Sequence, residues 1–273
     1  MQKYDHTFYR NTAILLVCIA MSACTFGSKR DAAPKRHVNV ADIPDAVPRI
    51  EPRSKGGNPR SYVVFGKKYS VMSSSHGYVE RGIASWYGTA FHGKKTSNGE
   101  TYSMYQMTAA HKSLPIPTYV EVRNLKNGRS IVVRVNDRGP FHNNRIIDLS
   151  YVAAKKLGIA GTGTGLVEVR SINPRTWNPD QQAKAIRTSN KQALSSFNTL
   201  FIQAGAFTSQ HNASQLQKQL LSLFPNKAIK LAKNGQDQLF RVRIGPIVSV
   251  EEADRIAQTI SENGHPAPHV IVE

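Results

Sequence analysis

The sequence has little cysteine and few acidic residues. It holds two cysteines in 273 residues, Cys18 and Cys24. Because both lie near the N-terminus, a disulfide framework is excluded for the rest of the chain. Lys and Arg number 36 against 18 Asp and Glu, which gives a formal net charge of +18 at pH 7. Such an excess predicts an anionic partner, and nucleic acid, anionic cell-wall polymer and a membrane surface all qualify.

The N-terminal segment has no apolar run long enough to span a bilayer as a helix, but it has the layout of a signal peptide. Lys3 and Arg10 precede a ten-residue apolar run, Thr12 to Met21, and small residues then lead to Cys24. We therefore predict a signal peptide over residues 1–23, which would remove Cys18 from the mature chain.

Met21-Ser22-Ala23-Cys24 resembles the bacterial lipobox, in which the cysteine is acylated and becomes the N-terminus after cleavage. Several acyl chains anchor a protein stably, so a lipid anchor on Cys24 predicts the membrane as a partner. The alternative is an ordinary secretory signal that is cut nearby. Thr25 stands where an Asp would resemble an inner-membrane retention signal, which implies the outer membrane.

Two stretches are poor in apolar periodicity. Residues 24–80 are rich in Pro, Gly, Ser and basic side chains and predict a flexible tether, with two apolar islands, Tyr62 to Phe65 and Tyr69 to Met72, that could pack onto the next domain. Residues 174–198 are polar and predict an interdomain linker. Two domains are therefore expected, over 81–173 and 199–273.

Residues 81–173 are mainly β in pattern. The expected strands are Gly82 to Gly88, Tyr119 to Asn124, Arg129 to Asn136 and Gly165 to Ile172. Asn127-Gly128 between the second and third is a strong hairpin signal. Ser150 can cap a short helix over Tyr151 to Leu157, which Gly158 can end. Together these elements predict a small barrel-like domain.

Residues 199–273 follow a βαββαβ order, which is a sheet with both helices on one face. The strands are Leu200 to Phe207, Ala228 to Ala232, Leu239 to Ile247 and His269 to Val272, and the helices are Gln210 to Leu223 and Val250 to Asn263. Alternation places Phe201, Gln203, Phe207, Leu239, Arg241 and Arg243 on the open face, and it covers Ile202, Ala204, Ala206, Phe240, Val242 and Ile244. An exposed stripe of aromatic, amide and guanidinium groups suits a sugar or a base.

Carboxylates are scarce in the middle domain. It has five, Glu100, Glu121, Asp137, Asp148 and Glu168, against thirteen Lys and Arg. Glu121 and Glu168 are expected on solvated faces, and Asp148 is expected to orient the helix start. Asp137 shares parity with Val133 and Val135, so its carboxyl should point to the apolar face, where desolvation would raise its pKa. Glu100 lies on a loop that could fold over the same site. Turn capping is the alternative for both.

No metal or cofactor is predicted. His92, His111 and His142 have no compact ligand spacing and no accompanying cysteine. Neither a Gly-x-Ser-x-Gly elbow nor a phosphate loop is present.

Six motifs of the middle domain occur in one order. They are Gly82 to Gly88, Phe91 to Gly93, Thr96 to Glu100, Met107 to His111, Val135 to Phe141 and Ile147 to Ser150. Together they resemble the rare lipoprotein A family, which implies a six-stranded double-psi β-barrel related to expansins. Phe201 to Phe207 and Arg241 to Pro246 resemble the signature positions of a SPOR domain, which has a ferredoxin-like or RNP-like arrangement.

The resemblance implies a lytic transglycosylase that cuts the MurNAc–GlcNAc β-1,4 bond of peptidoglycan without water and leaves 1,6-anhydro ends. Asp137 would be the acid and base, with Glu100 and His111 lining the site. The SPOR domain would bind glycan strands without stem peptides at the division septum, with cell-division proteins as candidate partners; the export signal argues against nucleic acid. Ser103 stands where the family usually has Asp, which favours the alternative of a non-catalytic septal peptidoglycan-binding lipoprotein.

Overall fold

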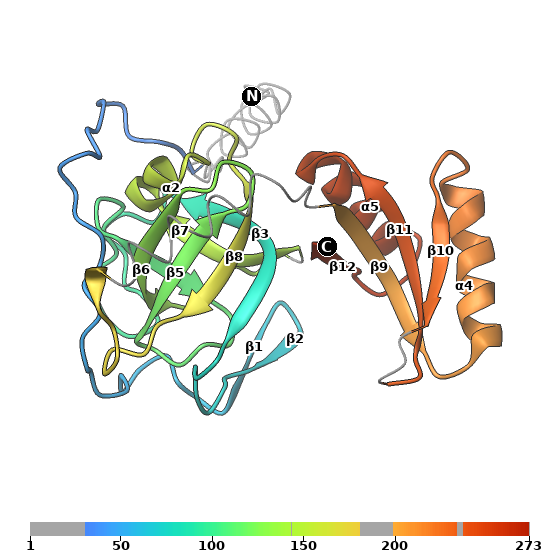
Figure 1. Ribbon diagram of the computed structural model, residues 1–273, viewed down its shortest axis with the longest axis horizontal. Helices are drawn as coiled ribbons and strands as arrows, with labels where there is room; N and C mark the ends of the chain where they lie inside the picture. The colour runs from blue at the N-terminus through green and yellow to red at the C-terminus, as the bar shows by residue number, and fades with distance from the viewer. Residues whose placement is uncertain (1–30, 143, 181–198, 234–236, 273) are drawn as a thin grey trace, which may run out of the picture. The chain divides into compact units, whose positions relative to one another are not determined.

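A closed six-stranded barrel forms the middle part of the chain, residues 79–171. The structure is a computed structural model that describes residues 31–142, 144–180, 199–233 and 237–272. The barrel strands, in order around the barrel, are β3 (Val79–Tyr87), β7 (Arg145–Ser150), β4 (Thr108–His111), β6 (Ser130–Asp137), β5 (Thr118–Asn124) and β8 (Gly165–Ser171) (Figure 1). The β3–β7 and β4–β6 pairs are parallel and the other four are antiparallel. The predicted six-stranded barrel is confirmed.

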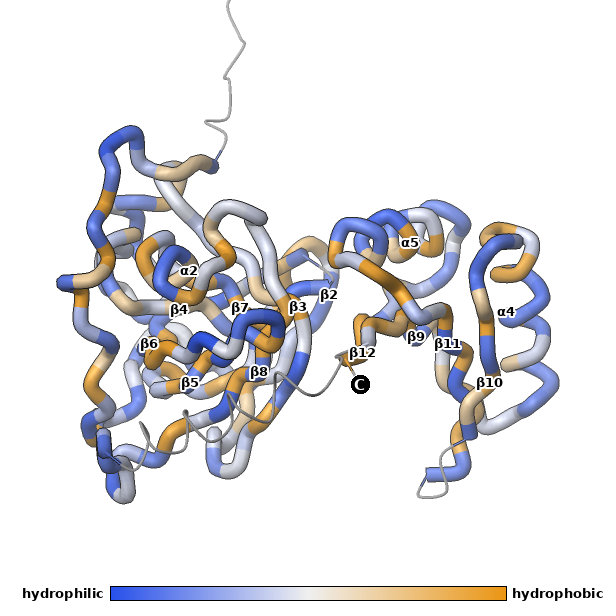
Figure 2. Tube along the Cα trace, turned by 45° about the horizontal axis from the view of Figure 1, so that its top comes forward, coloured by the Kyte–Doolittle hydropathy of each residue, from blue (hydrophilic) through white to orange (hydrophobic). Residues whose placement is uncertain are grey.

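Alternating apolar residues fill the barrel. Val120 and Val122 of β5, Val133 and Val135 of β6 and Val167 of β8 are fully buried. Figure 2 shows apolar segments along β5, β6 and β8. The helix α2 (Tyr151–Leu157) packs against β3, β6 and β7. Its ends are those predicted, because Ser150 Oγ accepts a hydrogen bond from the Ala153 amide and Gly158, with φ of 83°, ends it in the left-handed region.

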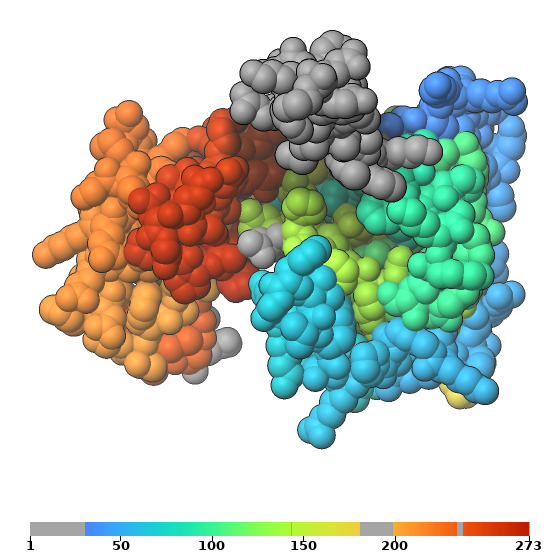
Figure 3. All heavy atoms as spheres, turned by 180° about the vertical axis from the view of Figure 1, so that it is seen from behind, coloured from blue at the N-terminus to red at the C-terminus, as the bar shows by residue number. Residues whose placement is uncertain are grey.

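Residues 32–60, here called the strap, pack against the barrel and are hydrogen-bonded to it. The Ala46 amide donates to Val132 O at 3.0 Å, and the Ser54 amide donates to Ile116 O at 2.9 Å. Figure 3 shows the blue N-terminal segment along the green atoms of the barrel. The expected flexible tether is therefore wrong over residues 32–60, since backbone hydrogen bonds attach a segment whose polar composition indicated no packing. Cys24 and the signal peptide lie outside the described residues.

A two-stranded hairpin follows the strap. It pairs β1 (Ser61–Val64) with β2 (Lys67–Ser70) and coincides with the two apolar islands. Tyr62 stacks on Tyr69 with ring centroids 5.3 Å apart, and both rings contact Phe141 of the barrel. The hairpin is thus attached to the barrel through three aromatic side chains.

The C-terminal domain has its own four-stranded antiparallel sheet. Its elements are β9 (Leu200–Phe207), α4 (Gln210–Leu223), β10 (Ile229–Lys233), β11 (Phe240–Ile247), α5 (Val250–Glu262) and β12 (His269–Val272). The strand order is β10-β11-β9-β12, which confirms the βαββαβ arrangement. Within the described ranges no helix combines the length and the apolar character needed to cross a membrane.

A β-bulge in β9 changes which side chains face the helices. Val242 pairs with Gly205 and Arg243 with Gln203, so Ala204 is an extra residue in β9. Beyond it, Phe207 pairs with Phe240 and packs against the helix-side core, whereas Ala206 pairs with Arg241 and is exposed. The predictions of an open Phe207 and a covered Ala206 are therefore wrong, because the bulge reverses the alternation.

Candidate active site

Asp137 lies at the end of β6, under the loop that carries Glu100. Its Oδ1 accepts hydrogen bonds from the Ser97 amide at 2.8 Å, from Ser97 Oγ at 2.6 Å and from the Arg138 amide at 2.7 Å. The loop is a compact turn in which the Thr96 amide donates to Glu100 O at 2.9 Å. The structure thus brings the loop and Asp137 together.

A register shift decides where the Asp137 side chain lies. Ala109 pairs with Val135, but the next residue of β4, Ala110, pairs with Asp137. Asn136 is consequently buried and Asp137 is partly exposed. The prediction that Asp137 continues the apolar alternation of β6 is wrong, because the bulge interrupts that alternation at the barrel rim.

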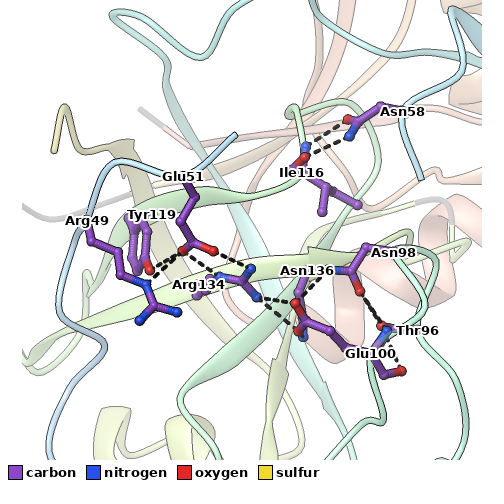
Figure 4. A network of polar contacts seen from close by, with 10 residues as sticks. All are labelled: Arg49, Glu51, Asn58, Thr96, Asn98, Glu100, Ile116, Tyr119, Arg134 and Asn136. Carbon is purple, nitrogen blue, oxygen red and sulfur yellow. Dashed lines mark hydrogen bonds and ion pairs between the residues drawn. The ribbon is translucent and has the colours of Figure 1, made fainter. Parts of the chain in front are cut away.

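Glu100 is held by three side chains (Figure 4). Arg134 Nη1 donates to its two carboxylate oxygens at 2.8 and 2.9 Å, Asn136 Nδ2 donates at 2.8 Å and Asn98 Nδ2 at 2.9 Å. Burial by itself raises the pKa of Glu100, but the hydrogen bonds from Asn136, Arg134 and Asn98 outweigh it and leave the pKa lowered. Glu100 is therefore a fixed carboxylate near neutral pH, unsuited to donate a proton.

The strap supplies the second partner of Arg134. Glu51 accepts from Arg134 Nε at 3.0 Å and from Nη2 at 2.8 Å, a two-point ion pair, and Tyr119 also donates to it. Burial raises the pKa of Glu51, but the hydrogen bonds from Arg134 and Tyr119 lower it to about 2. Sequence reasoning missed Glu51, because it stands in a Pro-rich basic stretch without periodicity.

The His111 side chain contacts neither the Asp137 nor the Glu100 carboxylate in the hydrogen bonds described. It is buried, and its Nδ1 accepts hydrogen bonds from the amides of Ser113 at 3.1 Å and Leu114 at 3.0 Å. Nε2 lies 2.8 Å from the Tyr78 hydroxyl, which donates in turn to Glu80. With Nδ1 accepting, the ring proton belongs on Nε2.

The surroundings of His111 keep its ring neutral. Burial, with smaller effects from the charges of Arg138 and Lys112, lowers its pKa to about 3. Its carbonyl accepts from Arg138 Nη1 at 3.0 Å, so His111 is connected to the residue after Asp137 through its backbone. The geometry gives His111 a positioning role and not that of a proton carrier.

Asp148 is a second carboxyl whose position differs from the one predicted. It lies within β7 and not at the helix cap, and Ser85 Oγ donates a hydrogen bond to it. Burial raises its pKa, against smaller opposing effects of Ser85, His142 and Arg145. A polar residue between the buried Ile147 and Leu149 was the signal that could have revealed it.

Four side chains form a row across adjacent strands. Ser85 pairs with Asp148, Asp148 with Ala110, and Ala110 with Asp137. Paired residues project from the same side of a sheet, so the two carboxyls flank the small Ala110 side chain. Two strand spacings separate their backbones by about 10 Å. Ala110 itself is buried, so the two partly exposed carboxyls are the groups of this row that a ligand could reach.

The other two carboxylates of the barrel, Glu168 and Glu121, differ in burial. Glu168 is 7% exposed and pairs with Arg81 at 2.8 Å, Arg170 at 3.1 Å and Arg123 at 3.3 Å. Burial raises the pKa of Glu121. The expectation of a solvated face is therefore wrong for Glu168, because three arginines neutralise it within the barrel wall, whereas Glu121 is partly exposed. Among the described residues, no three His, Cys, Asp or Glu side chains cluster as a metal site would require.

The predicted glycan-binding residues lie in or beside two strands of the C-terminal sheet. Phe201, Gln203, Arg241 and Arg243 are partly exposed in β9 and β11, and Leu239 immediately precedes β11. Arg241 Nη1 donates to Asp237 Oδ1 at 2.9 Å, and the hydrogen bonds of this pair lower the pKa of Asp237 to about 2. Some of the hydrogen-bond donors of Arg241 are therefore already used by Asp237.

Comparison with known proteins gives the family. A protein-family model described as lytic transglycolase matches residues 79–170, and the SPOR domain model matches residues 197–271. The endolytic peptidoglycan transglycosylase RlpA of Pseudomonas aeruginosa (strain UCBPP-PA14) is 41% identical in an alignment that covers 85% of this chain and 81% of that protein. The chain belongs to the rare lipoprotein A family.

Other members of the rare lipoprotein A family match it in part. The protein of the same name from Vibrio cholerae serotype O1 is 52% identical over 163 residues, 58% of this chain and 62% of that one. The crystal structure of the RlpA SPOR domain from Pseudomonas aeruginosa is 30% identical, covers 26% of this chain and 96% of that chain, and has a TM-score of 0.25.

Proposed function

We propose that the protein is a peptidoglycan lytic transglycosylase of the cell envelope, in which the barrel cleaves glycan strands and the C-terminal domain binds them. The row Asp148–Ala110–Asp137 at the barrel rim carries this proposal, since it presents two partly exposed carboxyls on either side of a small residue. The membership of the rare lipoprotein A family supports it. The proposed substrate is the MurNAc–GlcNAc β-1,4 bond, preferably in strands without stem peptides.

One carboxyl can perform both proton transfers of this reaction. Protonated Asp137 gives its proton to the GlcNAc oxygen as the bond to MurNAc C1 breaks; its carboxylate then takes the proton of the MurNAc C6 hydroxyl, whose oxygen closes the 1,6-anhydro ring on C1. No water is consumed, and Asp137 returns to its protonated form. Its hydrogen bonds to the described residues all end on Oδ1, which leaves Oδ2 to face the substrate.

The neighbouring groups have distinct tasks. Glu100 is a fixed negative charge beside the site, which favours the positive charge that develops on the sugar ring. Asp148 lies in the same row, and burial raises the pKa of its carboxyl, which makes it the second candidate for an acid–base role. His111 and Arg138 hold the backbone around Asp137 in place.

The second candidate is a non-catalytic glycan-binding lipoprotein. Ser103 favours it, because the family usually has Asp there; its Oγ accepts only a local hydrogen bond, at 3.3 Å, from the Tyr105 amide among the contacts described.

Asp137→Asn separates the two candidates. Asparagine keeps the size and the hydrogen-bond acceptor of Asp137 but removes the proton, so the release of 1,6-anhydro products from denuded strands should fall by about 10²–10⁴-fold. Mass spectrometry measures the products, and thermal unfolding checks that the variant is folded. A variant that cleaves at the parental rate would show that Asp137 is structural. A parental protein that releases no anhydro product would establish the binding candidate.

A further inference from the structure

A hollow of about 730 Å³ lies at the edge of the C-terminal sheet. β12 pairs with β9 only between Leu200 and Gln203, with His269 opposite Gln203. The later residues of β9 therefore border the hollow on one side, α4 borders it on another, and His265 to Ala267 close it. Its volume falls within the range of small-ligand sites, about 300–1,000 Å³.

The wall formed by α4 is a stripe of amides. Asn212, Gln215 and Gln219 are spaced three and four residues apart and are all exposed, while Leu216 and Leu220 of the same helix are buried. Figure 2 shows largely polar segments along α4. Each amide offers an acceptor oxygen and two N–H donors, the combination that neighbouring sugar hydroxyls and acetamido groups can satisfy. Gln215 Nε2 already contacts His211 Nε2 at 3.0 Å, which leaves its oxygen.

The remaining lining is apolar. The bulge at Ala204 turns Phe207 toward α4, where it lines the hollow. Gly205 permits this close approach, because a Cβ there would lie 2.6 Å from the Phe207 ring and 3.0 Å from Leu216 Cδ2. The lining contains neither Asp nor Glu. An apolar floor with amide walls fits the ring faces, hydroxyls and acetamido groups of a sugar, and no lining carboxylate would repel an anionic glycan strand.

We propose that this hollow, here called the edge groove, holds one or two sugar rings of the glycan that the domain binds. The inference rests on the proposed glycan binding and extends it from the open sheet face around the edge onto α4. Gln203 joins the two surfaces, since it pairs with Arg243 on one side and with His269 of the groove on the other. The amides of α4 recognise hydroxyl and acetamido groups, and Phe207 contacts the apolar face of a ring.

Affinity for denuded strands tests the edge groove in the full-length mature protein. The double substitution Gln215→Ala and Gln219→Ala should weaken binding to amidase-treated sacculi by about tenfold, since two neutral hydrogen bonds are lost. Its unfolding temperature should stay near the parental value, because both side chains are exposed. Gln258→Ala, an exposed glutamine of α5 outside the groove, is the matched control and should bind as the parent does.

A blocking variant makes the test independent of the amides. Ala267 is partly exposed and lines the groove from the segment that closes it, so Ala267→Trp should fill the groove and weaken binding at least as much. If the parent binds denuded strands and both the double variant and Ala267→Trp bind within twofold of it, the edge groove is not a glycan site, while the proposed function stands. If the parent does not bind denuded strands, both proposals are overturned.

Discussion

Asp148 has a raised pKa and lies in the proposed active-site row. Its replacement by Asn should therefore change stability and activity in opposite directions. Because its folded pKa lies above the unfolded value, ionisation destabilises the fold as the pH rises through that folded pKa. Asp148→Asn removes the ionisation. We therefore expect a higher unfolding temperature at pH 7, a gain that disappears below about pH 4, and slower release of anhydro products. Unchanged cleavage in the stabilised variant would restrict Asp148 to a structural role.

His111 gives the protein a stability that depends on pH. Its folded pKa of about 3 lies below the unfolded value, so the folded state binds fewer protons between these values and stability falls as the pH drops from about 6.5 toward 3. In His111→Asn the amide oxygen can still accept from the Ser113 and Leu114 amides. Its unfolding temperature should consequently vary less between pH 7 and pH 4.5 than that of the parent. His142→Asn, at an exposed histidine, is the control, and an equally steep parental and His111→Asn profile would refute this explanation.

At the scale of elements, Arg134 is one of the residues that connect the strap to the loop that carries Glu100. Arg134 joins Glu51 of the strap to Glu100, and its side chain is only 16% exposed. Glu51→Gln removes the charge that faces Arg134 and should destabilise the protein by about 1–3 kcal/mol, measured by urea unfolding. It should also lower cleavage, because Arg134 then holds Glu100 less firmly.

Arg49→Ala is the matched control for this pair. Arg49 contacts the same Glu51 carboxylate at 3.4 Å, but its side chain is 73% exposed, so its removal should change stability by less than about 1 kcal/mol. Equal losses in the two variants would contradict the coupling through Arg134.

The elements that could be predicted are those whose signals are local. Ser150 and Gly158 mark the two ends of α2, and Asn127-Gly128 marks the β5–β6 turn, so each of these was visible in a few neighbouring residues. β4 and β7 were not assigned as strands, because short strands buried within the barrel lack a clear alternation. The bulges at Asp137 and Ala204 depend on pairing with distant strands, and therefore both reversed a face that alternation had predicted.

At the scale of the whole molecule, the anchor on Cys24 remains a prediction. Replacement of Cys24 by Ser removes the sulfur that would carry lipid, so the variant should leave the outer-membrane fraction and lose incorporation of a labelled fatty acid. Fractionation with an unrelated outer-membrane lipoprotein as the internal control measures this. A Cys24→Ser protein that still sediments with the outer membrane would disprove the anchor.

If Cys24 carries the lipid anchor, attachment of the strap to the barrel limits the distance from the membrane at which the barrel can act. A free tether from Cys24 to Glu80 could extend about 200 Å, but the chain is attached to the barrel from about Ala32 onward, and eight residue steps extend at most about 28 Å. With Cys24 in the membrane, the start of the attached part of the chain would stay within about 28 Å of the membrane surface. Only glycan close to that membrane would then be within range of cleavage, so the thickness of the gap between membrane and wall would decide which strands are cut.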